Sequence, residues 1–447
     1  MVEHATLPRN EAGLTTVLGV LKQQFGDRLQ TGESIRQQHG HTTTWIENQP
    51  PDAVVFAHSV EDVADIVTVC AAHEVPVIPY GTGTSLEGHL NAPAGGISID
   101  LSALDRVLEV NAGDLDCRVQ PGVTREDLNT HLRDQGLFFP IDPGANASLG
   151  GMAATNASGT NAVLYGTMKD NILGLEAVMA DGRVIRTGTR ARKSSAGYDL
   201  TRLLVGSEGT LCVITEITLR LRGIPEAISS ARCSFRSVDA ACQTVMAVIQ
   251  YGLPVARIEL LDTEMVKAIN HYSKLGLPET PLLLLEFHGT EGSVIEQSEV
   301  FGALAEEHGA EGFEATTTTE ERNALWKARH DAYWAMLQYR PGANGVATDV
   351  CVPISRLAEA VTAAQDKARS LDLVMLTVGH VGDGNFHATP LVDMSDAEEV
   401  ERAAEFVSWL NDLAISMDGT CTGEHGIGQG KMPYLVKELG DATDFMR

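Results

Sequence analysis

Two glycine-rich segments without any basic residue constrain the fold of this chain most strongly. Pro79–Gly88 (PYGTGTSLEG) begins in the last two residues of an expected strand at 75–80, and Ile141–Gly166 (IDPGANASLGGMAATNASGTNAVLYG) again pairs glycines with small residues. Glycine lets a ligand approach backbone N–H groups closely, and hydroxyl side chains add neutral hydrogen-bond donors. The two segments therefore predict a domain whose loops wrap one extended dinucleotide.

Neither segment carries a common phosphate-binding fingerprint. After Gly81 and Gly83, the third glycine of a G-x-G-x-x-G motif would fall at position 86, which is leucine. No lysine follows these glycines, and the later GIGQGK at 426–431 lacks both the first glycine and the hydroxyl residue of a P-loop. We therefore expect backbone and hydroxyl groups, rather than a lysine, to hold the ligand.

The acidic composition excludes some partners. The chain has 33 Lys and Arg against 60 Asp and Glu, a net charge of −27, which disfavours nucleic acid. Seven scattered cysteines without a CxxC pair indicate a reducing compartment. No apolar run is long enough to span a membrane, and the first ten residues do not resemble an export signal. We expect a cytoplasmic protein, or a mitochondrial matrix protein if a transit peptide has been removed.

The spacing of apolar residues predicts two α+β regions that meet near 223–226. In the first region, EDVADIVTVCAAHE at 61–74 is typical of an amphipathic helix. Strands are expected at 96–101 and 211–221, with a hairpin at 174–187 around Asp181-Gly182. In the second region, helices should cover one face of a sheet. Its expected strands are 230–235, 256–261, 282–288 and 348–352, and its expected helices are 238–251, 263–275, 293–308, 320–339, 354–371 and 395–417.

The segment Leu373–Val392 (LVMLTVGHVGDGNFHATPLV) predicts a metal-binding hairpin. If Asp383-Gly384 forms a two-residue turn, His380 lies directly opposite His387 on one face of the hairpin. A divalent metal needs a third ligand, and GTCTGEHGIGQGK at 419–431 supplies adjacent Glu424 and His425. Two imidazoles and a carboxylate suit Zn, Mn or Fe.

These motifs, together with VGSEGTLCVIT at 205–215, resemble the vanillyl-alcohol-oxidase-type flavoproteins, which have a PCMH-type FAD-binding domain. The full set is most similar to the branch of D-lactate and D-2-hydroxyglutarate dehydrogenases, from about residue 52 to residue 430. The resemblance implies a two-part FAD-binding domain at 1–224 and a cap domain with a large antiparallel sheet at 225–418. It also implies a return segment at 419–447, with a tail that is truncated here.

The resemblance also implies a role for individual residues. His380, His387 and Glu424 correspond to metal ligands, His425 to the group poised over the substrate, and Arg329 to the carboxylate-binding arginine. Asn385 corresponds to a further catalytic residue beside them. Thr84 stands where some members attach FAD to histidine, which implies non-covalent FAD, and His89 lies past this loop. The residues expected to contact FAD are Pro79, Gly81, Thr82, Gly83, Thr84, Ser85, Gly88, Pro143, Gly144, Ser148, Gly150, Gly151, Thr155, Ser158, Gly159, Glu208, Gly209 and Ile214.

The implied reaction is the oxidation of a small D-2-hydroxy acid by hydride transfer from C2 to flavin N5. The hydroxyglutarate branch carries a lysine before its DVxxP strand, whereas this chain has Ala347 and Thr348. D-lactate is therefore the favoured substrate, with glycolate and D-2-hydroxyglutarate as alternatives. An alkyl-glycerone-phosphate-type transferase and a non-catalytic redox carrier are further alternatives. No nicotinamide motif is present, so we expect a quinone, a cytochrome or an electron-transferring flavoprotein as acceptor. A homodimer is a further possibility that the sequence does not decide.

Overall fold

The first sheet of the protein lies in the N-terminal region. The computed structural model describes residues 8–42, 44–316 and 318–446, so the expectations for the first seven residues and for Arg447 concern positions outside the described residues. The sheet has the order β1-β2-β4-β3, and its three longer strands run parallel. The apolar face predicted for the helix near 61–74 is confirmed, because that face of α3 is buried. The elements are β1 (Leu29–Gln30), β2 (Ala53–Phe56), β4 (Ile97–Asp100), β3 (Val77–Tyr80), α1 (Glu11–Phe25), α2 (Glu33–Gly40) and α3 (Val60–Ala72).

A second, antiparallel sheet completes the N-terminal region, and the predicted hairpin around Asp181-Gly182 joins two of its strands. The sheet has the order β5-β6-β10-β8-β9. The second glycine segment is not loop throughout, because its small residues allow a short helix, α5 (Leu149–Thr155), to pack against this sheet. The strands are β5 (Val107–Asn111), β6 (Asp116–Val119), β10 (Cys212–Arg220), β8 (Ile172–Met179) and β9 (Val184–Gly188), and the nearby helices are α4 (Arg125–Leu132), α6 (Ala162–Tyr165), α7 (Met168–Asn171) and α8 (Leu200–Leu204). The two-stranded sheet β7 (Leu137–Phe138) and β11 (Arg222–Gly223) lies beside it.

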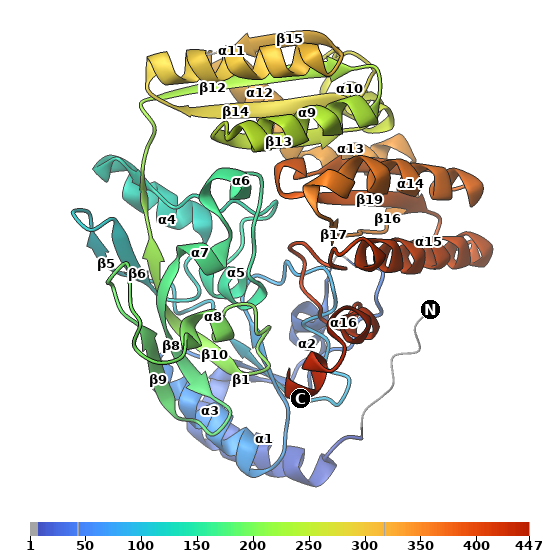
Figure 1. The fold of residues 1–447 in the computed structure, drawn as a ribbon. Coiled ribbons are helices and arrows are strands. Elements are labelled where there is room, and N and C mark those ends of the chain that lie inside the picture. The colour runs from blue at the N-terminus through green and yellow to red at the C-terminus, as the bar shows by residue number, and fades with distance from the viewer. Residues whose placement is uncertain (1–7, 43, 317, 447) are drawn as a thin grey trace.

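The third sheet is the large antiparallel sheet that the resemblance implied. Its order is β15-β12-β14-β13-β18-β19-β16, and β17 pairs with β19. Figure 1 shows this sheet above the N-terminal region, with α9 and α11 across one face. Its strands are β12 (Ala227–Phe235), β13 (Val255–Leu261), β14 (Leu282–Gly289), β15 (Ala310–Thr316), β16 (Asn344–Gly345), β17 (Val350–Cys351), β18 (Met375–Gly379) and β19 (Asn385–Val392).

Helices cover both faces of this sheet, so the expectation that they cover one face is wrong. Alternate residues of β14 enter two separate cores: Leu283 and Leu285 pack on one side, and Leu282 and Leu284 on the other. This apolar alternation gives each face a surface that must be buried. One face is covered by α9 (Val238–Tyr251), α11 (Glu291–Glu307), α14 (Leu357–Ser370) and α15 (Ala397–Ser416), and the other by α10 (Thr263–Ser273), α12 (Thr319–His330) and α13 (Ala332–Tyr339).

Three local expectations in this region need correction. The helix expected at 320–339 is two helices, because Asp331 interrupts it, and both halves contribute to the same core. The expected strand at 348–352 is only the short β17. The expected helix at 354–371 begins as a 3₁₀ turn at 354–356, so that α14 starts at Leu357. The edge strand β15 was not expected, since much of AEGFEAT is polar and exposed.

After α15 the chain returns to the N-terminal region. The backbone N–H of Gly428 donates to Glu208 at 2.8 Å, and that of Gln429 donates to the carbonyl of Glu87 at 2.7 Å. The chain then forms α16 (Met432–Leu439) and α17 (Ala442–Met446). Among the described residues, no helix combines the length and the apolar character needed to cross a membrane. The domain limits at 224/225 and 418/419 stay a prediction.

Candidate active site

One cavity of about 620 Å³ lies where the glycine segments face the cap. Every residue expected to contact FAD lines it except Gly88 and Gly159. Gly159 has a φ of +146°, and a Cβ there would lie 2.3 Å from the carbonyl oxygen of Asp142. Gly88 also has a positive φ of +76°. These two positions therefore require glycine because of the backbone.

The glycine segments offer this cavity neutral hydroxyl groups, as expected for a dinucleotide site. The buried hydroxyls of Ser85 and Ser148 line it and have no hydrogen-bond partner among the described residues. A buried polar atom without a partner is costly, so these hydroxyls fit a ligand that supplies hydrogen bonds. A Cβ on Gly81 would lie 2.3 Å from Ser148 Oγ, which shows how closely the two glycine segments approach. The residues present therefore fit FAD.

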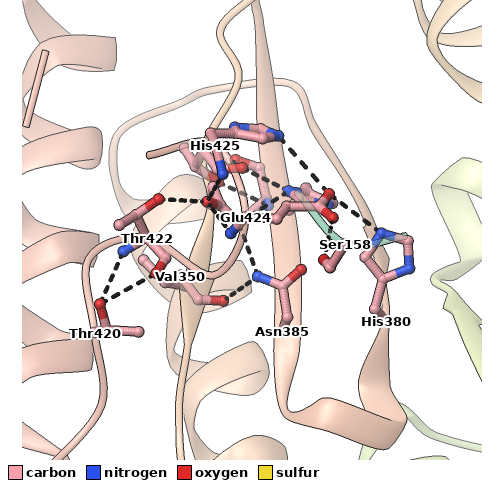
Figure 2. Close-up of polar contacts among 12 residues, drawn as sticks. Ser158, Val350, His380, Asn385, Thr420, Thr422, Glu424 and His425 are labelled. Carbon is pink, nitrogen blue, oxygen red and sulfur yellow. Dashed lines mark hydrogen bonds and ion pairs between the residues drawn. The ribbon is translucent and has the colours of Figure 1, made fainter. Parts of the chain in front are cut away.

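Three potential metal ligands meet in the lining of this cavity. His380 follows β18, His387 lies on β19, and Glu424 comes from the return segment. Glu424 Oε1 lies 3.3 Å from His380 Nε2 and 3.4 Å from His387 Nε2. One ligand atom from each residue lies within 4.8 Å of the others. Figure 2 shows the Glu424 carboxylate facing the His380 ring. Two imidazole nitrogens and a carboxylate oxygen fit one divalent cation.

The hairpin brings the two histidines together in a different register from the one expected. The turn is the 3₁₀ segment Val381–Asp383 closed by Gly384, and His387 pairs with Val378 instead of His380. The prediction of a two-residue turn is therefore wrong. The shift moves the partner of His387 by two positions, and a shift of two keeps a side chain on the same face of a strand. The ring centroids of His380 and His387 consequently remain 5.6 Å apart.

Each of the three potential ligands also has a hydrogen-bond partner outside the cluster. His380 Nδ1 lies 2.7 Å from Glu259 Oε1, and His387 Nδ1 lies 2.8 Å from the carbonyl oxygen of Thr348. The Ser158 hydroxyl, which was expected to contact FAD, lines the cavity but donates to Glu424 Oε2 at 2.7 Å. These contacts leave both Nε2 atoms directed toward Glu424.

His425 lies against this cluster. Its ring stacks on that of His387, with centroids 5.1 Å apart and an interplanar angle of 9°. Its Nδ1 has no hydrogen-bond partner among the described residues. Burial lowers the pKa of His425 to about 4, although the nearby Asp349 carboxylate acts in the opposite direction. The imidazole is therefore neutral at pH 7 and can accept a proton.

Asp349, which sequence reasoning missed, fixes the loop that carries Glu424 and His425. It is fully buried, and its Oδ2 accepts the backbone N–H groups of both residues at 2.8 and 2.7 Å. Asn385 donates to Asp349 Oδ1 at 2.8 Å and is absent from the residues that line the cavity. The structure thus places Asn385 outside the cavity lining, where it supports Asp349.

Arg329 on α12 is the arginine that lines the cavity. Its Nε and Nη2 lie 2.8 and 2.7 Å from Glu259 Oε2. Sequence reasoning missed Glu259 as well. The available signal was a carboxylate in the centre of the apolar strand VARIELL, where a charge requires a partner.

Comparison with known proteins agrees with this geometry. A family model described as FAD linked oxidases, C-terminal domain, matches residues 224–447, and one described as FAD binding domain matches residues 51–188. The chain belongs to the FAD-linked oxidases. The family resemblance inferred from the motifs is therefore confirmed, and so is the use of FAD.

The relatives and neighbours extend over nearly the whole chain. A probable mitochondrial D-lactate dehydrogenase of Danio rerio is 47% identical over 96% of this chain and 87% of the relative. A mitochondrial D-lactate dehydrogenase [cytochrome] of Arabidopsis thaliana is 44% identical over 95% and 75%, respectively. The solved structure of p-cresol methylhydroxylase superposes with a TM-score of 0.81 at 17% identity over 99% and 95%. That structural likeness confirms the PCMH-type fold.

Proposed function

We propose that this FAD-linked oxidase converts D-lactate to pyruvate. The observation that carries the proposal is the convergence of Arg329, His425 and the His380–His387–Glu424 cluster on the cavity lined by the glycine segments. The substrate class is supported by the D-lactate dehydrogenase names of the relatives at 47% and 44% identity. Glycolate and D-2-hydroxyglutarate are the alternative substrates.

The chain's own residues would divide the reaction between them. Arg329 binds the substrate carboxylate through its guanidinium group. His380, His387 and Glu424 would hold a divalent metal, which when bound lowers the pKa of the substrate hydroxyl. His425 accepts the hydroxyl proton while the C2 hydrogen leaves with its electron pair, so that C2–O becomes a carbonyl. FAD supplies the acceptor for that hydride.

Bleaching of the enzyme-bound flavin tests this proposal. Under anaerobic conditions, D-lactate should reduce the yellow holoenzyme within one turnover, whereas L-lactate should not. A panel that includes glycolate and D-2-hydroxyglutarate ranks the three substrates by rate of flavin reduction. Flavin that stays oxidised with all of them would exclude the dehydrogenase and favour a transferase or a redox carrier.

The electrons must then leave the protein. We propose a quinone, a cytochrome or an electron-transferring flavoprotein as acceptor, and the name of the Arabidopsis relative supports a cytochrome. Reoxidation of the lactate-reduced protein by ferricytochrome c, but not by NAD, is the expected result. Both relatives are named as mitochondrial, which supports the mitochondrial alternative for location.

FAD should be bound without a covalent bond. Thr84 offers no nitrogen for attachment, and His89, which directly follows this segment, has its Nε2 2.9 Å from the Glu208 carboxylate. Acid precipitation of the holoenzyme should therefore release free yellow flavin into the supernatant. Flavin that remains with the precipitated protein would show a covalent link.

Loss of Arg329 should weaken use of the substrate. Breaking a buried charge pair costs about 2 kcal/mol or more, so Arg329→Ala should lower kcat/KM for D-lactate by about 30-fold or more. Arg329→Lys should recover only part of this loss, because lysine lacks the planar fork. Lys327→Ala is the matched control, since Lys327 lies on the same helix with a side chain that is 74% exposed. Equal kinetics of Arg329→Ala and the control would remove Arg329 from the site.

A further inference from the structure

The buried carboxylate of Glu259 links two groups that the proposed reaction uses separately. It lies on β13 with a side chain that is 0% exposed, between Arg329 and His380. We propose that Glu259 is a positioning residue that orients the carboxylate-binding arginine and a metal ligand at the same time. The inference rests on the proposed function, which assigns Arg329 to the substrate and His380 to the metal.

The strand places this carboxylate on the side that faces the cavity. Ile258 and Leu260 enter the core beneath α9 and α14, so Glu259 between them points to the opposite face of the sheet. That face carries α12, which brings Arg329 over the strand. Glu259 is itself not among the residues that line the cavity. It therefore acts on the site through its two partners.

The contact with His380 selects the tautomer of that ring. Glu259 Oε1 lies 2.7 Å from Nδ1, and an ionised carboxylate can only accept a hydrogen bond. The Arg329 guanidinium, 2.7 Å from Oε2, supplies a positive charge that favours the ionised form of this carboxylate. In the neutral imidazole Nδ1 then carries the hydrogen, which leaves the Nε2 lone pair free. Nε2 is the atom that lies 3.3 Å from Glu424 Oε1, where the metal ligands converge.

The contact with Arg329 uses the other oxygen. Both Nε and Nη2 of Arg329 approach Glu259 Oε2, at 2.8 and 2.7 Å. One edge of the guanidinium is therefore fixed on the sheet, and the remaining N–H groups stay available to a substrate carboxylate. Each oxygen of Glu259 thus serves one partner.

An amide of the same size cannot replace this carboxylate. If the glutamine oxygen accepts from His380, its NH₂ group faces the guanidinium, which has only donors. If the amide is turned round, its NH₂ group donates to Nδ1 and the hydrogen moves to Nε2, where it blocks metal binding. The Nδ1–H group of His380 and the Arg329 guanidinium are both donors. The side chain at position 259 must therefore offer an acceptor atom to each, and only a carboxylate does so.

Zinc affinity of FAD-loaded, metal-depleted protein tests the proposal without turnover. Competition with a chelator should show that Glu259→Gln binds Zn²⁺ about 10- to 100-fold more weakly than the parent protein. The same variant should raise the KM for D-lactate. Glu286→Gln is the matched control, because Glu286 is a buried carboxylate on the neighbouring strand β14 that contacts His288 and Arg257 instead. Parent-like Zn²⁺ affinity and KM in Glu259→Gln would overturn the inference.

A second variant separates positioning from damaged packing. Glu259→Asp keeps two acceptor oxygens on a shorter side chain, so its Zn²⁺ affinity should lie between those of the parent and Glu259→Gln. Equal losses in both variants would contradict a role that depends on the acceptor chemistry. Because the zinc measurement contains no substrate, it stays decisive for His380 even if D-lactate fails to bleach the parent flavin, which would instead refute the proposed function.

Discussion

His425→Ala should reduce the flavin about 10²- to 10⁴-fold more slowly than the parent protein when D-lactate is mixed with it anaerobically. A general base typically contributes a factor of that size. The structure supports this role, because the buried, neutral ring lines the cavity and its Nδ1 has no hydrogen-bond partner among the described residues. Stopped-flow absorbance of the flavin measures the step directly and does not depend on the electron acceptor.

Retention of both cofactors separates this effect from damage to the site. Asp349 binds the backbone of His425, not its side chain, so the loop should keep its shape in the variant. FAD content and divalent metal content should therefore equal those of the parent. A variant that reduces flavin at the parent rate and loses only affinity for D-lactate would assign the proton transfer to another group.

His387→Ala should lose the bound divalent metal and keep FAD. The substitution removes one of three ligands and also leaves the carbonyl of Thr348 without its imidazole partner. Elemental analysis should find about one metal ion per chain in the parent and almost none in the variant. Flavin reduction should fall steeply as well, because the hydroxyl proton is then removed without help from a cation.

The control for this prediction is another buried imidazole of the same sheet. His288 on β14 bonds to Tyr165 and Glu286 and is absent from the cavity lining. His288→Ala should therefore keep its metal even if it unfolds at a lower temperature. Full metal occupancy in His387→Ala would place the cation elsewhere.

Local patterns in the sequence were sufficient for most elements and for selecting residues that the structure gathers around one cavity. The helix expected at 238–251 has those bounds, because its apolar spacing and its Ser237 cap and Gly252 terminus are local features. The glycine segments and the histidine hairpin likewise depend on short-range chemistry. The cavity lining accordingly contains nearly all residues expected to bind FAD.

The hairpin shows where local reasoning reaches its limit. Asp383-Gly384 is a strong signal for a two-residue turn, yet the chain forms a 3₁₀ turn, and a Cβ on Gly384 would lie 2.1 Å from the carbonyl oxygen of Val352. Tertiary contacts therefore decided the register. The proximity of His380 and His387 was still foreseen, because a shift by two residues preserves the face of a strand.

By itself the sequence determined the glycine loops, the helices with clear periodicity and the hairpin that carries two histidines, because each depends on residues close together in the chain. Only the tertiary structure decided which buried residues hold the side chains of the site in place. Glu259 reaches Arg329 and His380 from 70 and 121 residues away, and Asp349 reaches His425 from 76 residues away. Strand order and helix packing bring together residues that lie so far apart in the sequence. Buried charges must find partners, but no local pattern states which ones.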